Sequence, residues 1–122
     1  MSSELRIAAI TGIDEISPGV DLGSVIYVAL QAQKLELQQG DIFVVTQKIV
    51  SKAEGRIVNL TDVQPSAFAQ IAAAQGKKDA QHVEVVLRES RRIVRMDHGV
   101  LIAESKHGFI CANAGVDESN VN

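Results

Sequence analysis

The sequence predicts an α+β domain with a mixed β-sheet and two or three helices packed against it. Apolar runs of β-formers, such as residues 42–46, alternate with segments of helical periodicity, such as residues 22–34. A hairpin pattern surrounds residues 97–99, and the irregular order of elements argues against a doubly wound sheet. The chain contains neither a P-loop nor a Gly-x-Gly-x-x-Gly turn, so the predicted fold is neither a P-loop nor a Rossmann fold.

The first elements follow from apolar runs and their punctuation. Residues 5–10 and 42–46 predict strands, the second buried on both faces because it is continuously apolar. Residues 11–19 predict a loop that contains two glycines and a proline. Asp21 is placed to cap an amphipathic helix that is expected to end near Lys34.

The second half predicts two helices and a hairpin. Residues 55–60 favour a short strand, and Ser66 then precedes an Ala-rich helix that ends at Gly76. Asp79 is placed to cap the next helix, on which His82 is expected to face solvent. Residues 93–96 and 100–103 are expected to pair around the turn at 97–99.

Composition bounds the function classes. With 122 residues the chain can form one modest core, and its net charge of −3 makes nucleic acid an unexpected partner. No apolar stretch approaches the roughly 20 residues of a membrane helix. The first residues show no basic region followed by an apolar run, so no signal peptide is expected. A single cysteine, Cys111, excludes an internal disulfide and reads as an inert core thiol, and the expected location is the cytoplasm.

Residues 107–120 carry the densest set of metal-binding oxygens. Asn113, Asp117, Ser119 and Asn120 lie within a few residues of one another, and such ligands suit Mg²⁺ or Mn²⁺ beside phosphates. The alternative is structural, because Asp-x-Ser-Asn is also a good turn or helix N-cap. The residues alone leave both interpretations open.

Two earlier segments carry groups that suit phosphate. Residues 47–56 follow a predicted strand and contain Lys48 and Lys52, which could neutralise phosphate oxygens or lie on the surface in solvent. Gly12 opens the sequence Gly-Ile-Asp-Glu, where the absence of a Cβ would let a ligand approach the backbone. A plain strand-to-helix turn is the alternative there.

A third segment is rich in arginine. Residues 88–95 contain four arginines and one glutamate, which fits a solvated helix end or a grip on an anionic substrate. We favour the solvated interpretation for three of the four.

Together, residues 107–120, 47–56 and 88–95 resemble the signature segments of the coenzyme F-420:gamma-glutamyl ligase family. The resemblance covers nearly all of the chain. It implies a GTP-dependent, ATP-independent ligase that joins L-glutamate to the lactyl carboxylate of a deazaflavin precursor through an acyl phosphate. It also implies a divalent metal, Mg²⁺ or Mn²⁺, and a homodimer.

The resemblance assigns roles to individual positions. Asp117 matches the metal ligand, while His107 is either a positioning group or a polar strand-end residue. Gln47 stands where many members have serine or histidine. The positions that match nucleotide contacts are Gly12, Ile13, Asp14, Glu15, Gln47, Lys52 and Asn120.

The resemblance implies that the family's catalytic module continues beyond the position that matches Asn122 and supplies a further acidic metal ligand there. Residues 1–122 are therefore expected to be a single domain that forms the N-terminal part of a longer module, inactive by itself. Two other classes stay open. One is a module that binds nucleotide or metal without catalysis, and the other is a structural remnant that needs a second polypeptide.

Overall fold

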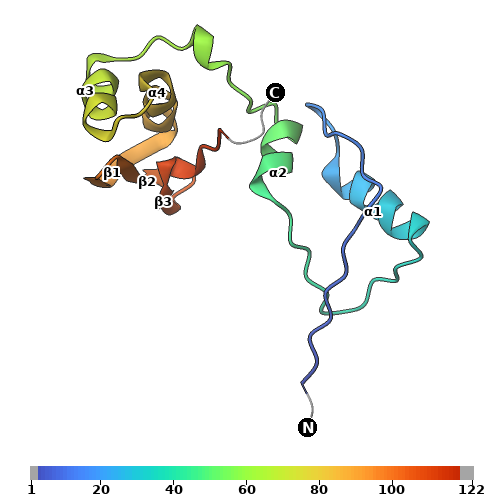
Figure 1. The fold of residues 1–122 in the computed structure, drawn as a ribbon. Helices are drawn as coiled ribbons and strands as arrows, with labels where there is room; N and C mark the ends of the chain where they lie inside the picture. The colour runs from blue at the N-terminus through green and yellow to red at the C-terminus, as the bar shows by residue number, and fades with distance from the viewer. Residues whose placement is uncertain (1–2, 119–122) are drawn as a thin grey trace. The chain divides into compact units, whose positions relative to one another are not determined.

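The computed structural model describes residues 3–118, and the α+β class is confirmed. The described residues form four α-helices and a three-stranded antiparallel sheet (Figure 1). The chain divides into two compact units, Met1–Ile57 and Val58–Asn122. No helix among the described residues is long and apolar enough to cross a membrane.

The first unit contains two helices, α1 (Leu22–Ala32) and α2 (Gln47–Ala53). The predicted cap of α1 is confirmed, because the Asp21 carboxylate accepts from the Gly23 backbone N–H at 3.0 Å. This bond satisfies an amide that has no partner within the helix. Helix α1 ends slightly earlier than expected, and Lys34 follows it in the left-handed region with a φ of 54°.

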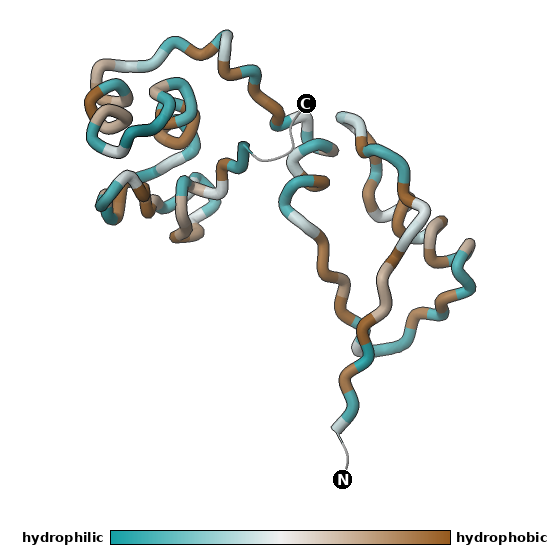
Figure 2. The backbone as a smooth tube through the Cα atoms, viewed as in Figure 1, coloured by the Kyte–Doolittle hydropathy of each residue, from teal (hydrophilic) through white to brown (hydrophobic). Residues whose placement is uncertain are grey.

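The strands predicted at 5–10 and 42–46 are wrong for this structure. Neither segment pairs with another strand, and Ile42 and Val44 are 86% and 92% exposed. Figure 2 shows residues 42–45 as a hydrophobic extended segment before α2. The short strand predicted at 55–60 is also absent, and Leu60 begins a 3-10 helix, η1 (Leu60–Asp62). β-propensity favours extended backbone, but a strand forms only where a partner completes its hydrogen bonds.

The second unit contains the two helices predicted there, α3 (Ala67–Gly76) and α4 (Ala80–Glu89). Both predicted caps are confirmed. The Ser66 hydroxyl accepts from the Ala69 N–H at 3.2 Å, and the Asp79 carboxylate accepts from the Gln81 N–H at 2.7 Å. Each cap fixes where its helix begins.

The sheet consists of β1 (Ser90–Asp97), β2 (Val100–Ser105) and β3 (Ile110–Ala112) in that order. The predicted hairpin is confirmed, with His98 and Gly99 at φ values of 46° and 80° in its turn. Positive φ at both central residues matches the right-handed twist of the strands. Both strand pairs in the described part of the chain are antiparallel, so the parallel pair of a mixed sheet is not among them.

The core of the second unit lies between the helices and β2. Its buried cluster contains residues from α3, α4 and β2, namely Ala69, Ala72, Ala73, Val83, Val86 and Leu101. The small alanines of α3 allow its backbone to approach α4 closely. His82 is also buried, at 7% exposure, so the prediction that it faces solvent is wrong.

Helix α3 meets the hairpin turn through two glycines. A Cβ built on Gly76 would lie 2.6 Å from the Gly99 Cα, which is too close for any side chain. Two backbones can approach this closely only where neither residue carries a Cβ. The pair therefore sets the distance between the end of α3 and the turn at the end of β1.

Candidate functional site

The predicted nucleotide loop in the first unit is held on both sides. The Gln33 side chain accepts from the Thr11 N–H at 2.8 Å and donates to the Ala9 carbonyl at 3.2 Å. On the far side, Ile16 is buried at 8% exposure. A single side chain after α1 thus makes two bonds to the strand-like start of the loop, and one apolar residue anchors its end.

Within this loop, the backbone at Gly12 is open. Gly12 has a φ of 76°, and a Cβ built on it would meet no atom within 4 Å. Glycine adopts this conformation at little cost, so the loop can present its backbone to a ligand. Asp14 and Glu15 are exposed beside it, and Ile13 is half-buried.

Lys52 and Glu15 form an ion pair, although they are far apart in sequence. The Lys52 side chain is 18% exposed and the Glu15 side chain is 80% exposed. A nearby backbone bond, from the Gly19 N–H to the Ala53 carbonyl at 2.8 Å, ties the loop to the end of α2. The structure therefore brings two of the predicted nucleotide residues together, and a lysine here could exchange a carboxylate partner for a phosphate.

Gln47 is the first residue of α2 and is exposed. The sequence predicts Gln47 directly after a strand, whereas the structure places it in a helix that has Thr46 as N-cap. The role of Gln47 in nucleotide binding stays a prediction. A surface hollow of about 540 Å³ lies along α1, lined by Tyr27, Leu30, Lys34, Leu37 and their neighbours, and none of the predicted residues lines it.

In the second unit, the predicted metal segment leaves β3 through an unusual backbone. Asn113, Ala114 and Gly115 form a 3-10 turn, η2 (Asn113–Gly115), with consecutive φ values of 52°, 51° and 77°. Left-handed backbone costs energy at the alanine, because its Cβ crowds the following carbonyl. In the described part of the chain, the Asn113 Oδ1 is a buried side-chain atom without a hydrogen-bond partner. Such local cost is a feature that functional segments often share.

Asp117 follows this turn and is exposed. Its neighbour Glu118 approaches α4, where the Glu118 Oε2 lies 3.5 Å from the His82 Nε2. Asn120 and Ser119 lie outside the described residues. Residues 3–118 contain no group of three or more acidic, histidine or cysteine side chains that could hold a metal. The exposed carboxylate fits a hard divalent cation as one ligand, and further ligands would have to come from elsewhere.

The four arginines of residues 88–95 each have a carboxylate partner. Arg88 donates to Glu84 at 3.0 Å, and Arg95 donates to Asp97 at 2.7 Å. Arg91 and Arg92 both reach Glu104, at 3.5 Å and 2.6 Å. All four arginine side chains are more than half exposed and pair with carboxylates of this chain, which supports the solvated interpretation.

His107 lies in the turn between β2 and β3 and is exposed, and Cys111 is half-buried on β3. The contact between His82 and Glu118 is not among the expectations drawn from the sequence. A signal was present, because His82, Val85 and Val86 have the i, i+3, i+4 spacing of one helix face. His82 therefore lies on a face of α4 that also carries buried valines.

The chain is similar to known proteins over nearly all of its length. Residues 11–122 match the model of the F420-0:gamma-glutamyl ligase family. The chain belongs to this family. Among its relatives are proteins named coenzyme F420:L-glutamate ligase. The one from Methanothermobacter thermautotrophicus is 41% identical over 117 residues, which are 96% of this chain and 46% of the relative.

Two other relatives have the same name. The Methanopyrus kandleri protein is 42% identical over 95% of this chain and 44% of its own length. The Archaeoglobus fulgidus protein is 36% identical over 96% of this chain and 45% of its own. The chain thus spans less than half the length of these relatives.

Proposed function

We propose that this chain is the GTP-binding and metal-binding part of a ligase that joins L-glutamate to a deazaflavin coenzyme F-420 precursor. Family membership supports the ligase class. The observation that carries the proposal is the contact of Lys52 with the Gly12–Glu15 loop. These residues supply open backbone and a cation at one place, which is what a nucleotide phosphate needs.

The reaction would proceed in two steps. An oxygen of the precursor's carboxylate attacks the γ-phosphorus of GTP, and GDP leaves, which forms an acyl phosphate. The glutamate amine then attacks the acyl carbon, and phosphate leaves as the amide forms. In this scheme Lys52 would leave Glu15 and bind phosphate oxygens, holding the nucleotide while charge redistributes.

Asp117 would be one ligand of Mg²⁺ or Mn²⁺. When bound, the cation would neutralise charge on the transferring phosphoryl group. The role of Asp117 would be to hold it, since a carboxylate is the preferred ligand of such ions. Asn120 is proposed to contact the nucleotide through its amide.

Calorimetric titration with GTP, with and without Mn²⁺, tests this proposal. Lys52→Ala should weaken GTP binding under both conditions, because lysine acts on phosphate directly. Asp117→Asn should weaken it only when Mn²⁺ is present, because the amide keeps the shape but loses the charge. Lys106→Ala and Asp62→Asn alter exposed residues outside the predicted site and should change neither affinity. Equal losses for Asp117→Asn under both conditions would make Asp117 a turn former.

An alternative is a module that binds nucleotide without ligation or needs a second polypeptide. It is favoured by the lack, among the described residues, of a group of three or more side chains that could hold a metal. Both proposals expect no glutamate ligation from these residues alone, and a ligation assay tests this expectation. Measurable turnover would mean that the site is placed wrongly.

We also propose a cytoplasmic homodimer. Exposed apolar side chains such as Ile42, Val44 and Phe109 support self-association. Sedimentation velocity over a range of concentrations tests it, and a monomer at all concentrations would refute it.

A further inference from the structure

His82 occupies an unusual position for a histidine in this protein. It lies on α4 with its side chain 8% exposed, next to the core residues Val83 and Val86. Its Nε2 points to one charged partner in the described contacts, the Glu118 carboxylate at 3.5 Å. Buried polar groups are costly unless they are paired, and the contact with Glu118 gives the buried imidazole a partner.

The segment that contains Asp117 is held on both sides of that residue. Val116 packs against the buried cluster of the second unit, and its N–H donates to the Asn113 carbonyl at 2.9 Å. Its φ of −70° and ψ of 124° are extended, and successive side chains of extended backbone point in opposite directions. Val116 packs against the cluster and the Glu118 carboxylate reaches His82 on α4, so the residues on both sides of the exposed Asp117 contact the unit.

The left-handed turn before this segment explains how it reaches α4. Three consecutive residues with positive φ, in η2, redirect the chain after β3, and η2 packs against both β2 and α4. Val116 alone would fix only the beginning of the segment. The contact between His82 and Glu118 fixes its other side.

We infer that His82 is a positioning residue that orients the Asp117 carboxylate through Glu118. This inference rests on the proposed metal role of Asp117, because a carboxylate that binds a metal needs a fixed orientation. A proton on the His82 Nε2 would donate to the Glu118 carboxylate, which lies 3.5 Å away, while the imidazole ring is buried on α4. His82 thus acts through Glu118, which lies 36 residues later in the sequence, on the geometry of Asp117.

NMR of the metal-free full chain tests the orientation directly. Heteronuclear NOE values of the Asp117 and Glu118 amides should fall in His82→Leu, which keeps the apolar volume but removes the donor. Glu118→Ala, at the exposed end of the same contact, should produce the same fall. The double variant should show no further fall, because both changes break one contact. His82→Gln, which retains a donor, should restore part of the order.

Mn²⁺ titration of the same variants connects the contact to the site. The dissociation constant for Mn²⁺ should rise about 10-fold in His82→Leu and in Glu118→Ala, as expected for loss of a group that orients a ligand. Amides of Val86 and Leu101 should keep their NOE values and thereby show that the core is intact. Unchanged order at Asp117 in both variants would overturn the inference. If the unaltered chain binds no Mn²⁺, the metal proposal fails, and the NOE measurement still decides whether His82 holds the segment.

Discussion

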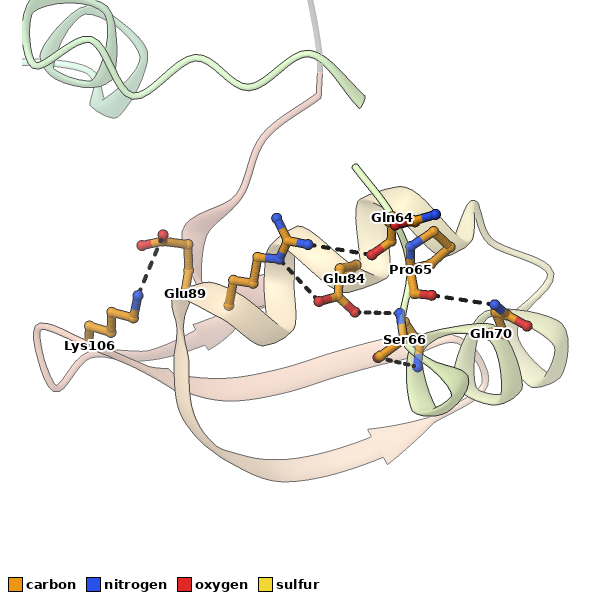
Figure 3. Close-up of polar contacts among 9 residues, drawn as sticks. Gln64, Pro65, Ser66, Gln70, Glu84, Glu89 and Lys106 are labelled. Atoms are coloured by element: carbon orange, nitrogen blue, oxygen red, sulfur yellow. Dashed lines mark hydrogen bonds and ion pairs between the residues drawn. The ribbon is translucent and has the colours of Figure 1, made fainter. Parts of the chain in front are cut away.

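Glu84 forms polar contacts with both the start of α3 and the end of α4. Its carboxylate accepts from the Ser66 N–H at 2.9 Å and from the Arg88 Nε at 3.0 Å, and Arg88 also donates to the Gln64 carbonyl (Figure 3). The pKa of Glu84 lies below its ordinary value of 4.5, because its hydrogen bonds favour the charged form of the carboxylate. The bond from the Ser66 backbone N–H contributes most, and the contact with Arg88 contributes less. The carboxylate therefore links the N-terminus of α3 to α4.

This contact predicts a pH dependence of stability. Because the folded-state pKa is lowered, the contribution of Glu84 is complete above pH 4.5 and is lost as the pH falls through the lower folded-state value. Glu84→Gln should reduce the slope of unfolding free energy against pH in that acidic window. Urea unfolding followed by circular dichroism at several pH values measures this. Glu36→Gln, at an exposed position, is the control, and equal slopes for the two variants would contradict the prediction.

Replacing Glu15 is expected to change the affinity for GTP in the opposite direction to replacing Lys52. Because its carboxylate pairs with Lys52 and repels phosphate, Glu15→Gln should tighten GTP binding by roughly 2- to 5-fold, the scale of a partly exposed ion pair. Calorimetry at low ionic strength measures the change, which should shrink as salt is added. A loss of affinity as large as that of Lys52→Ala would show that Glu15 itself contributes to binding.

At the scale of elements, the meeting of α3 with the β1–β2 turn depends on two glycines. Alanine at position 76 would gain helix propensity of up to about 1 kcal/mol. That gain is outweighed, because the new Cβ would lie 2.6 Å from the Gly99 backbone, which cannot move aside as a flexible side chain could. Gly76→Ala should therefore lower the free energy of unfolding by about 1–3 kcal/mol.

Denaturant unfolding of Gly76→Ala measures that loss. The neighbouring variant Gln75→Ala alters an exposed helical position and should stay within about 0.5 kcal/mol of the unaltered protein. A Gly76→Ala protein as stable as the original would mean that the helix end and the turn are farther apart than the structure places them.

At the scale of the molecule, the protection of backbone amides from hydrogen exchange is expected to differ between segments. The buried cluster of residues 69–101 lies in the second unit, whereas residues 42–46 are exposed and form no described strand. Amide hydrogen exchange should therefore be slowest in α3, α4 and β2 and fast throughout residues 5–10 and 42–46. Slow exchange at Val44 and Val45 would show that this segment pairs in solution, as its sequence predicts.

The parts of this protein that the sequence determined by itself are local. Asp21, Ser66 and Asp79 begin their helices because each side chain bonds an amide within three residues, and His98–Gly99 closes a hairpin between neighbouring runs. The family is likewise indicated by contiguous segments, of which residues 47–56, 88–95 and 107–118 lie within the described chain.

Tertiary structure decided what depends on partners distant in sequence. Residues 42–46 have the composition of a buried strand, yet a strand also needs a neighbour whose hydrogen bonds it completes. His82 is buried because α4 turns that face toward the core, and its contact with Glu118 exists only after η2 redirects the chain. The pairing of Lys52 with Glu15 has the same origin, since the bond from the Gly19 N–H to the Ala53 carbonyl ties the loop to the end of α2. Local patterns specify helix ends and turns, while the position of each site residue depends on how those elements pack.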